Sequence, residues 1–93
     1  MPFKYDVSDG LEETQARLFK KDRKTYEALM KKIEEMASGD EKTVEFYKNL
    51  RYGLSDCKRA HVAKSFVLLF RVFKEKKFIL FGRFGHHDDI YKR

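Results

Sequence analysis

Residues 57–93 read CKRAHVAKSFVLLFRVFKEKKFILFGRFGHHDDIYKR. Two runs within this stretch, 66–73 and 78–84, consist mainly of Phe, Val, Leu and Ile, and the charged residues 74–77 separate them. Each run has the length of a strand, and aromatic and β-branched side chains favour a strand over a buried helix. We therefore predict a buried β-hairpin at the centre of the fold.

A short strand and a helix are predicted near the N-terminus. Residues 3–7 alternate apolar and polar side chains, which indicates a strand with one buried face. Ser8 or Asp9 can cap a helix over about 10–21, and Asp9 and Glu12 have the spacing of a capping box. The apolar stripe of this helix is thin, so we expect it at a surface. The stripe consists of Leu11, Gln15, Leu18 and Phe19.

A second helix is predicted over 23–38, because apolar side chains recur there at spacings of three and four. Gly39 is expected to end this helix in the left-handed conformation. Only a few residues around Asp22 separate the two helices, so they should form an antiparallel hairpin. The apolar positions of the second helix are Tyr26, Leu29, Met30, Ile33, Met36 and Ala37.

The element order predicts the fold class. Residues 40–53 fit either a short helix or a loop, and three strands are predicted after them, over about 58–63, 66–73 and 77–85. The order β-α-α-β-β-β predicts an α+β fold with a small, mostly antiparallel sheet and a helical hairpin packed on one face. Residues 1–93 are expected to form a single domain. The uncovered face of the sheet is the natural place for a site.

Composition points to an anionic partner. Lys and Arg number 21 and Asp and Glu number 15, which gives a net charge of +6. This charge favours nucleic acid, an acidic protein or anionic lipid. The single cysteine, Cys57, excludes an internal disulfide, and no apolar run is long enough to cross a bilayer, so we expect a cytoplasmic protein. A helical hairpin lying on a membrane surface is an alternative, less favoured because the sheet needs a cover.

Strand parity groups the polar side chains. Residues two apart in a strand share a face, so Arg59 and His61 lie together. On the last strand, Arg83 has the parity of Ile79, Phe81, Gly85 and, if the strand continues, His87. Gly85 is expected to open space between Arg83 and His87. If the two faces coincide, two histidines and two arginines meet on the open side of the sheet; the sequence leaves this pairing open.

These side chains suit the cleavage of RNA by its own 2′-hydroxyl. That reaction needs a base for the hydroxyl proton, an acid for the leaving 5′-oxygen, and cations for the charge that builds on the phosphate. Histidine serves both proton roles because its unperturbed pKa is near ~6.5, and arginine grips two phosphate oxygens with its planar fork. A lone histidine on a strand is otherwise a surface or hydrogen-bonded residue, and this ordinary explanation stands beside the functional one.

We predict no metal site and no cofactor. The segment His86-His87-Asp88-Asp89 is a candidate, but adjacent histidines on a strand point to opposite faces and no fourth ligand has a recognisable spacing. Asp88 and Asp89 are expected to cap the strand or to orient a histidine. Cys57 is expected to have no role, since no motif supports its pairing with a histidine.

Three motifs follow one another in the C-terminal part: Ala60-His61-Val62, the apolar strand Val67-Leu68-Leu69-Phe70, and Arg83-Phe84-Gly85-His86-His87. The last is similar to the motif Arg-x-Gly-x-His, and Tyr91 stands four residues after His87. On these residues the chain resembles the RelE/ParE superfamily of type II toxins, and within it the YafQ branch of RelE-like mRNA interferases. The resemblance implies a RelE-like fold.

The resemblance also implies an activity and partners. The chain would be a ribosome-dependent endoribonuclease that cuts mRNA in the ribosomal A site, needs no metal, and is held inactive by a cognate acidic antitoxin in a toxin–antitoxin hetero-oligomer. By position, His87 would be the general acid, His61 the base or an orienting group, Arg83 a phosphate contact, and Tyr91 a nucleotide-positioning ring. The other expected RNA contacts are Lys48, Arg51, Lys58, Arg59, Lys64 and His86.

The chain departs from the family pattern in three places. Ser65 stands where the YafQ branch carries an acidic residue, and Val67 stands where the RelE branch carries a strand arginine. A histidine that the family carries in the preceding loop has no counterpart, since Asn49, Leu50 and Arg51 occupy that region. The catalytic set is therefore expected to be a variant one, with its acid and base assignment open. Two other functions also stay open: a ParE-like toxin that inhibits DNA gyrase and does not need the histidines, and a non-catalytic RNA-binding module.

Overall fold

The predicted hairpin forms the middle of the sheet. In the computed structural model, which describes residues 3–39 and 57–90, β3 (Phe66–Phe73) and β4 (Phe78–His86) run antiparallel and are joined by the 3-10 turn η1 (Lys74–Lys76). β3 has the bounds expected from its apolar run. β4 begins one residue later than expected, because Lys77 belongs to the turn and takes a positive φ of 52°.

Two outer strands complete the sheet, in the order β1-β4-β3-β2. β2 (Lys58–Val62) pairs antiparallel with β3, and β1 (Lys4–Val7) pairs parallel with β4. A parallel pair needs a long connection, and here both helices and two strands lie between β1 and β4 in the chain. The predicted α+β fold is therefore confirmed, with a mixed sheet in which the antiparallel pairs predominate.

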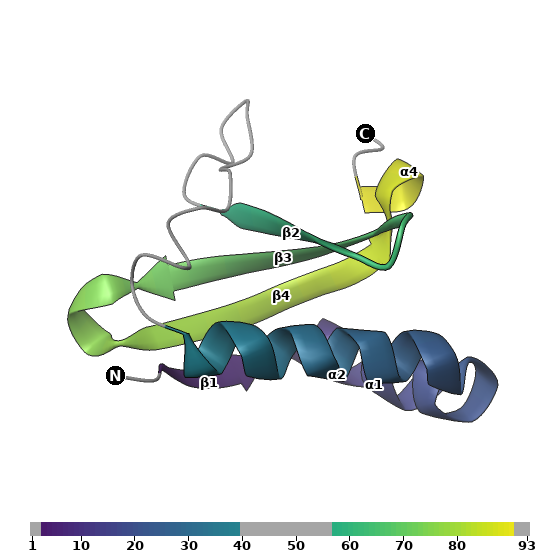
Figure 1. Ribbon diagram of the computed structural model, residues 1–93, viewed down its shortest axis with the longest axis horizontal. Helices are drawn as coiled ribbons and strands as arrows, with labels where there is room; N and C mark the ends of the chain where they lie inside the picture. Colours follow the sequence, from purple (N-terminus) through teal and green to yellow (C-terminus); the bar gives the residue numbers. More distant parts are fainter. Residues whose placement is uncertain (1–2, 40–56, 91–93) are drawn as a thin grey trace.

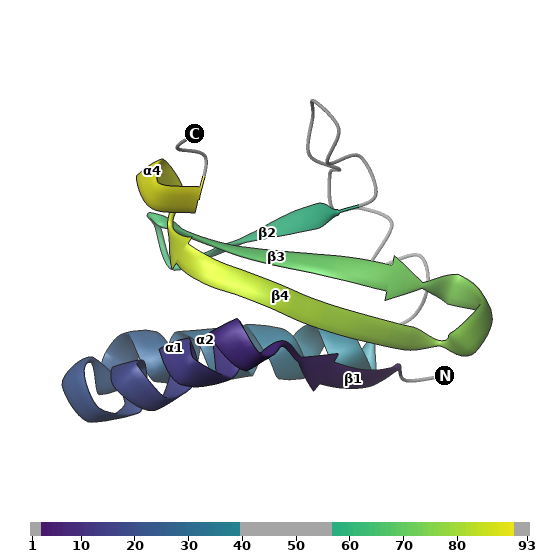
Figure 2. The same cartoon turned by 180° about the vertical axis from the view of Figure 1, so that it is seen from behind.

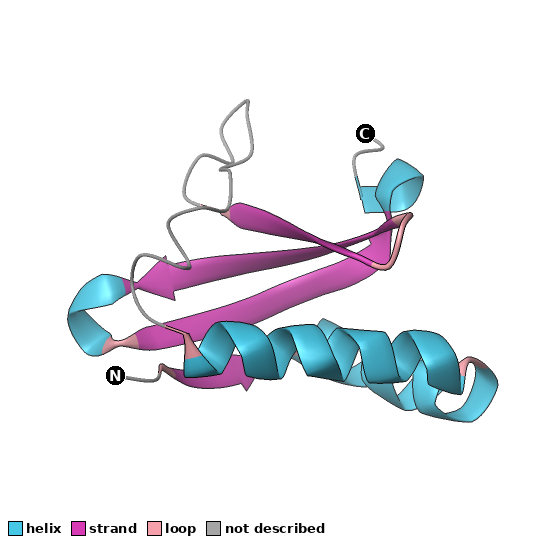
Figure 3. Cartoon of the chain, viewed as in Figure 1, coloured by secondary structure: helices cyan, strands magenta, loops and turns pink. Residues whose placement is uncertain are grey.

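Both helices cover one face of the sheet (Figures 1 and 2). α1 (Asp9–Lys21) and α2 (Arg23–Ser38) form the expected helical hairpin, and the bounds of α2 agree with its apolar spacing. Figure 3 separates this helical layer from the layer of strands. Between the layers lies the main core, whose fully buried large side chains include Leu11, Leu29, Ile33, Met36, Leu68, Phe70, Ile79 and Phe81.

Ser8, rather than Asp9, is the N-cap of α1. The Ser8 hydroxyl oxygen accepts a hydrogen bond from the N–H of Leu11 at 3.1 Å, so Asp9 lies inside the first turn. The helix therefore starts one residue earlier than expected, and a capping box that begins at Asp9 is wrong. The same hydroxyl donates to the carbonyl of Gly82 at 2.6 Å, which ties the start of α1 to β4.

The short connection between the helices also caps α2. The Asp22 carboxylate accepts from the hydroxyl of Thr25 at 2.6 Å and from its N–H at 3.2 Å, and these bonds hold the pKa of Asp22 below its ordinary value. Gly39 follows the last residue of α2, as expected. Its backbone is extended, with φ at −80°, so the expected left-handed conformation is wrong.

A register shift in β4 decides which of its side chains share a face. Leu69 pairs with Arg83 whereas Phe70 pairs with Phe81, so Gly82 is an extra residue in β4 and forms a bulge. Phe81 is buried in the main core and Arg83 is exposed. The predicted common face of Arg83 with Ile79 and Phe81 is therefore wrong, because the bulge reverses the alternation between them.

β4 ends at His86, and the chain then turns over the face of the sheet opposite the helices as α4 (His87–Ile90), visible in Figure 1. The strand therefore ends one residue later than the expected Gly85, and the continuation to His87 that the sequence left open does not occur. β2 ends at Val62, one residue earlier than expected, because Ala63 takes a positive φ of 54° in the turn. The alternatives for 40–53 concern residues outside the described ranges. Within those ranges, no helix is both long and apolar enough to span a membrane.

Candidate functional site

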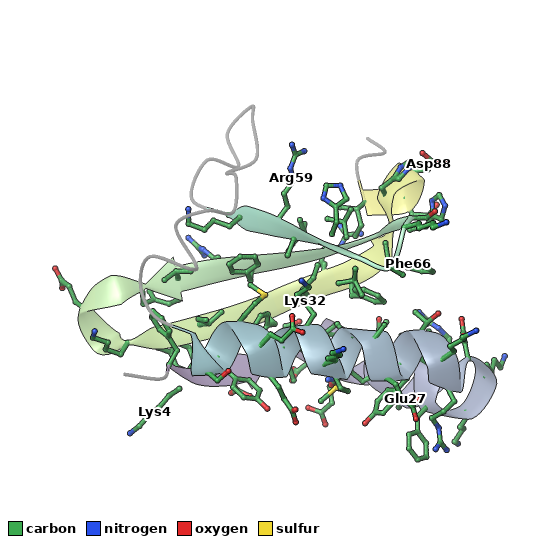
Figure 4. All side chains as sticks on the ribbon, in the orientation of Figure 1. Lys4, Glu27, Lys32, Arg59, Phe66 and Asp88 are labelled. Atoms are coloured by element: carbon green, nitrogen blue, oxygen red, sulfur yellow. The ribbon has the colours of Figure 1, made fainter. Side chains whose placement is uncertain are left out.

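Two arginines share a row on the sheet face away from the helices. Arg59 of β2 pairs with Leu69 of β3, and Leu69 pairs with Arg83 of β4. Residues opposite one another on neighbouring strands point to the same face, and two strand spacings put the two arginine Cα atoms about 10 Å apart. Figure 4 shows Arg59 pointing away from the helices. The sequence left open whether Arg59 and Arg83 share a face; the register places them on the same one, through the bulge and not through simple parity.

The next row on this face contains a histidine and a small apolar cluster. His61 pairs with Val67, and Val67 pairs with Gly85. His61 is exposed, whereas Val67 is fully buried although it lies outside the main core. Part of its cover comes from α4, since the Ile90 side chain lies 3.5 Å from where a Cβ on Gly85 would be. The space expected over Gly85 is thus filled by Ile90.

His87 sits at the corner where α4 leaves the sheet. Its backbone N–H donates to the carbonyl of Ser65 at 2.8 Å, which ties α4 to the turn between β2 and β3. Its Nδ1 lies 2.8 Å from Oδ1 of Asp88, so the prediction that this aspartate orients a histidine is confirmed. The sequence did not predict the backbone hydrogen bond between His87 and Ser65 or the packing of Ile90 over Gly85. They depend on α4, which leaves no periodic signal in four residues.

The two neighbouring histidines differ in their hydrogen bonds. Nδ1 of His86 accepts from the N–H of Asp88 at 3.2 Å, whereas Nδ1 of His87 faces the Asp88 carboxylate. A carboxylate only accepts, so a neutral His87 holds its proton on Nδ1 and keeps the lone pair of Nε2. Protonated, His87 would present an N–H at Nε2 as well. One ring nitrogen can therefore serve as a base or as an acid, depending on its charge.

The prediction of no metal site at residues 86–89 assumed that the two histidines point to opposite faces of a strand, and this assumption is wrong. The two imidazole rings do not point to opposite faces, because His87 lies in α4 and not in the strand, and their centroids are 4.8 Å apart. Among the described residues, His86, His87 and Asp88 bring three ligand atoms within 4.8 Å of one another.

Three of the four strands of the sheet carry charge of one sign. β2, β3 and β4 together contain no Asp or Glu, whereas α1 and α2 carry both acidic and basic residues. A polyanion laid on the face away from the helices would therefore meet no carboxylate from these three strands. The cations of the three strands are Lys58, Arg59, Arg71 and Arg83.

The remaining predicted contacts are dispersed. Lys58 pairs with Phe70 and so has the parity of the helix-facing side, away from Arg59. Lys64 is exposed in the turn after β2. His86 ends β4 with its ring 5.9 Å from that of Phe66. The predicted contacts Lys48, Arg51 and Tyr91 lie outside the described residues.

Comparison with known proteins finds relatives over nearly the whole chain. It is 40% identical over 91 residues to the protein named "Putative toxin RelE4" of Methanocaldococcus jannaschii. The aligned residues cover 98% of this chain and 93% of that protein. It is 33% identical over 75 residues to an uncharacterized protein of Methanosarcina mazei. The aligned residues cover 81% of this chain and 83% of that protein. The sequence matches no protein-family model.

Solved structures share the fold. A chain of the toxin–antitoxin complex RelBE2 from Mycobacterium tuberculosis superimposes with a TM-score of 0.69 at 20% identity, covering 92% of each chain. YafQ from E. coli strain BL21(DE3) superimposes with a TM-score of 0.61 at 18% identity, and the match covers 96% of this chain and 98% of YafQ. The conserved hypothetical protein HP0892 from Helicobacter pylori superimposes with a TM-score of 0.59 at 18% identity, and the match covers 96% of this chain and 99% of HP0892. The expected RelE-like fold is confirmed.

Proposed function

The chain belongs to the RelE family of toxins, and from this membership we propose that it is an mRNA endoribonuclease that acts on the ribosome. The observation that carries the proposal is the register of the sheet. It aligns Arg59 with Arg83 on one row and sets His61 on the next, on a face to which β2, β3 and β4 contribute no carboxylate. Such a face suits the phosphate backbone of RNA.

Each side chain has one role in the proposed reaction. Arg83 and Arg59 bind the phosphate and offset the charge that grows on it as the 2′-hydroxyl attacks. His61, as the base, takes the hydroxyl proton, and protonated His87, as the acid, gives the Nε2 proton to the leaving 5′-oxygen. The products are a 2′,3′-cyclic phosphate and a free 5′-hydroxyl. The Asp88 carboxylate, 2.8 Å from Nδ1, fixes the orientation of the His87 ring.

A partner follows from the same membership. The similar chain from M. tuberculosis was solved in a toxin–antitoxin complex, and we propose a cognate antitoxin for this chain as well. The basic sheet face suits an acidic segment that orders on binding. Binding there would cover the arginine row and keep the protein inactive.

The test is cleavage of mRNA on programmed ribosomes by the wild type and by His87→Ala, His61→Ala and Arg83→Ala. Loss of a proton-transfer group should lower the rate by about 10²–10⁴-fold. Arg17→Ala, which removes an exposed arginine from α1, is the matched control for Arg83→Ala and should cleave at the wild-type rate. Thermal melts of all variants show whether each one folds.

Full cleavage by a folded His87→Ala variant would contradict the proposed acid. Growth arrest upon expression with DNA breakage and intact mRNA would favour the ParE-like alternative. Salt-dependent RNA binding without cleavage on ribosomes would favour the non-catalytic module.

A further inference from the structure

Three consecutive side chains, at the point where β4 passes into α4, bring their ligand atoms close together. Nδ1 of His87 lies 2.8 Å from Oδ1 of Asp88, and Nδ1 of His86 lies 3.7 Å from Oδ2 of the same carboxylate. The three ligand atoms all lie within 4.8 Å of one another. The carboxylate therefore faces both imidazoles, and both of its oxygens take part.

Contacts from outside the segment hold the His86 ring and the backbone of His87. The His86 ring packs edge-on against Phe66 at 5.9 Å, and the backbone of His87 is bonded to Ser65. Ile90, three residues further on, anchors α4 over Gly85. A segment whose backbone is anchored in this way loses less conformational freedom when its side chains take up a ligand.

We propose that His86, His87 and Asp88 bind one divalent transition-metal ion such as Zn²⁺. Two imidazoles and a carboxylate are the donor set of open zinc sites, in which water fills the fourth position. The side chains are 41%, 45% and 75% exposed, which leaves an open side for that water. Binding replaces the 3.2 Å hydrogen bond from the N–H of Asp88 to His86 and the contact between His87 and Asp88.

Occupancy of this site would switch off His87, a consequence that rests on the proposed function. With Nδ1 bound to the metal, the ring's only proton is on Nε2. Nε2 then has no lone pair with which to accept a proton, and loss of its own proton would leave a metal-bound imidazolate, so this nitrogen can serve neither as a base nor as an acid. Zn²⁺ would therefore inhibit cleavage rather than support it.

Metal binding is tested first, in what we call the binding arm of the experiment. The affinity for Zn²⁺ is measured by calorimetric titration of the wild-type protein, and the visible spectrum of bound Co²⁺ is a second readout. One ion per chain is expected. His86→Ala and Asp88→Asn should each weaken binding at least ~10-fold, since even partners outside the ligand set change metal affinity by about 10–100-fold. Asp88→Asn keeps the shape of the side chain, so it serves if His86→Ala disturbs the packing on Phe66.

Two controls separate this site from other donors in the chain. His61→Ala removes the remaining histidine and Cys57→Ser the single thiol, and both should bind Zn²⁺ as the wild type does. Mg²⁺, which prefers oxygen ligands, should give no comparable binding. The proposal is overturned if the wild type binds no Zn²⁺, if His86→Ala and Asp88→Asn bind as tightly as the wild type, or if either control loses the ion.

The activity arm measures ribosomal cleavage with added Zn²⁺ and then with a zinc-selective chelator, at constant Mg²⁺ so that ribosomes stay intact. Inhibition that the chelator reverses is expected. Cleavage that is unchanged by saturating Zn²⁺ would overturn the regulatory consequence. Absence of any cleavage would count against the proposed function, whereas the binding arm would still decide the metal site.

Discussion

At the scale of single residues, Ser8 has two structural roles. Its hydroxyl oxygen accepts from the N–H of Leu11 and so caps α1, and its hydroxyl proton goes to the carbonyl of Gly82, the bulge residue of β4. Its backbone N–H also donates to the carbonyl of Phe81 at 2.9 Å. One serine thereby links the start of the helical hairpin to the point where β4 changes the face of its side chains.

Ser8→Ala should destabilise the protein by about 1–3 kcal/mol, since it loses a helix cap and a side-chain hydrogen bond together. Ser8→Asp should fall between the wild type and Ser8→Ala, because a carboxylate can cap the helix but cannot donate to Gly82. Denaturant unfolding monitored by circular dichroism measures both. Ser38→Ala, which removes a hydroxyl from an exposed position at the end of α2, should change stability little. Equal effects at Ser8 and Ser38 would contradict the double role.

At the scale of elements, α4 is the part of the described chain that positions His87. Ile90 packs over Gly85 on the sheet, and the N–H of His87 is bonded to Ser65. The element is only four residues long and has no fully buried side chain of its own. Its place therefore depends on the half-buried Ile90 and on the turn between β2 and β3.

Ile90→Ala should destabilise the protein by about 1–2 kcal/mol, the value of half-burying an aliphatic side chain, and should release α4 from the sheet. The direct readout is hydrogen exchange of the His87 amide, which should become fast in this variant. Leu80→Ala removes a half-buried leucine from β4 at a distance from α4 and is the matched control. It should lower stability without exposing the His87 amide, and an amide equally protected in both variants would show that Ile90 does not hold α4.

The same elements show what the sequence can predict. α2 and β3 have the expected bounds, because each is specified by a local apolar pattern. The face of Arg83 was not predictable, since the bulge at Gly82 is a property of pairing with Leu69 and Phe70 of another strand. The position of His87 was missed for the same physical reason: the strand ends where Ile90 finds a packing site on Gly85, and no local pattern encodes that contact.

At the scale of the whole molecule, the two layers differ in charge. The helices carry acidic and basic residues side by side, whereas β2, β3 and β4 carry only basic ones. Opposite charges that lie side by side in one layer largely offset one another in the field outside it. β2, β3 and β4 therefore contribute only positive charge to the field that a polyanion meets at the sheet.

This division of charge predicts how RNA binding depends on salt. Each phosphate neutralised on a single strand contributes about −0.7 to the slope of log K against log salt. Arg83→Ala and Arg59→Ala should therefore each reduce the size of the slope by ~0.7, measured by fluorescence anisotropy with a single-stranded RNA between 50 and 200 mM salt. Arg17→Ala removes the same charge from the helical layer, where phosphates are not expected, and should leave the slope unchanged. A slope that falls as much for Arg17→Ala as for Arg83→Ala would mean that RNA responds to net charge alone, and that the arginine row on the sheet has no special part in binding.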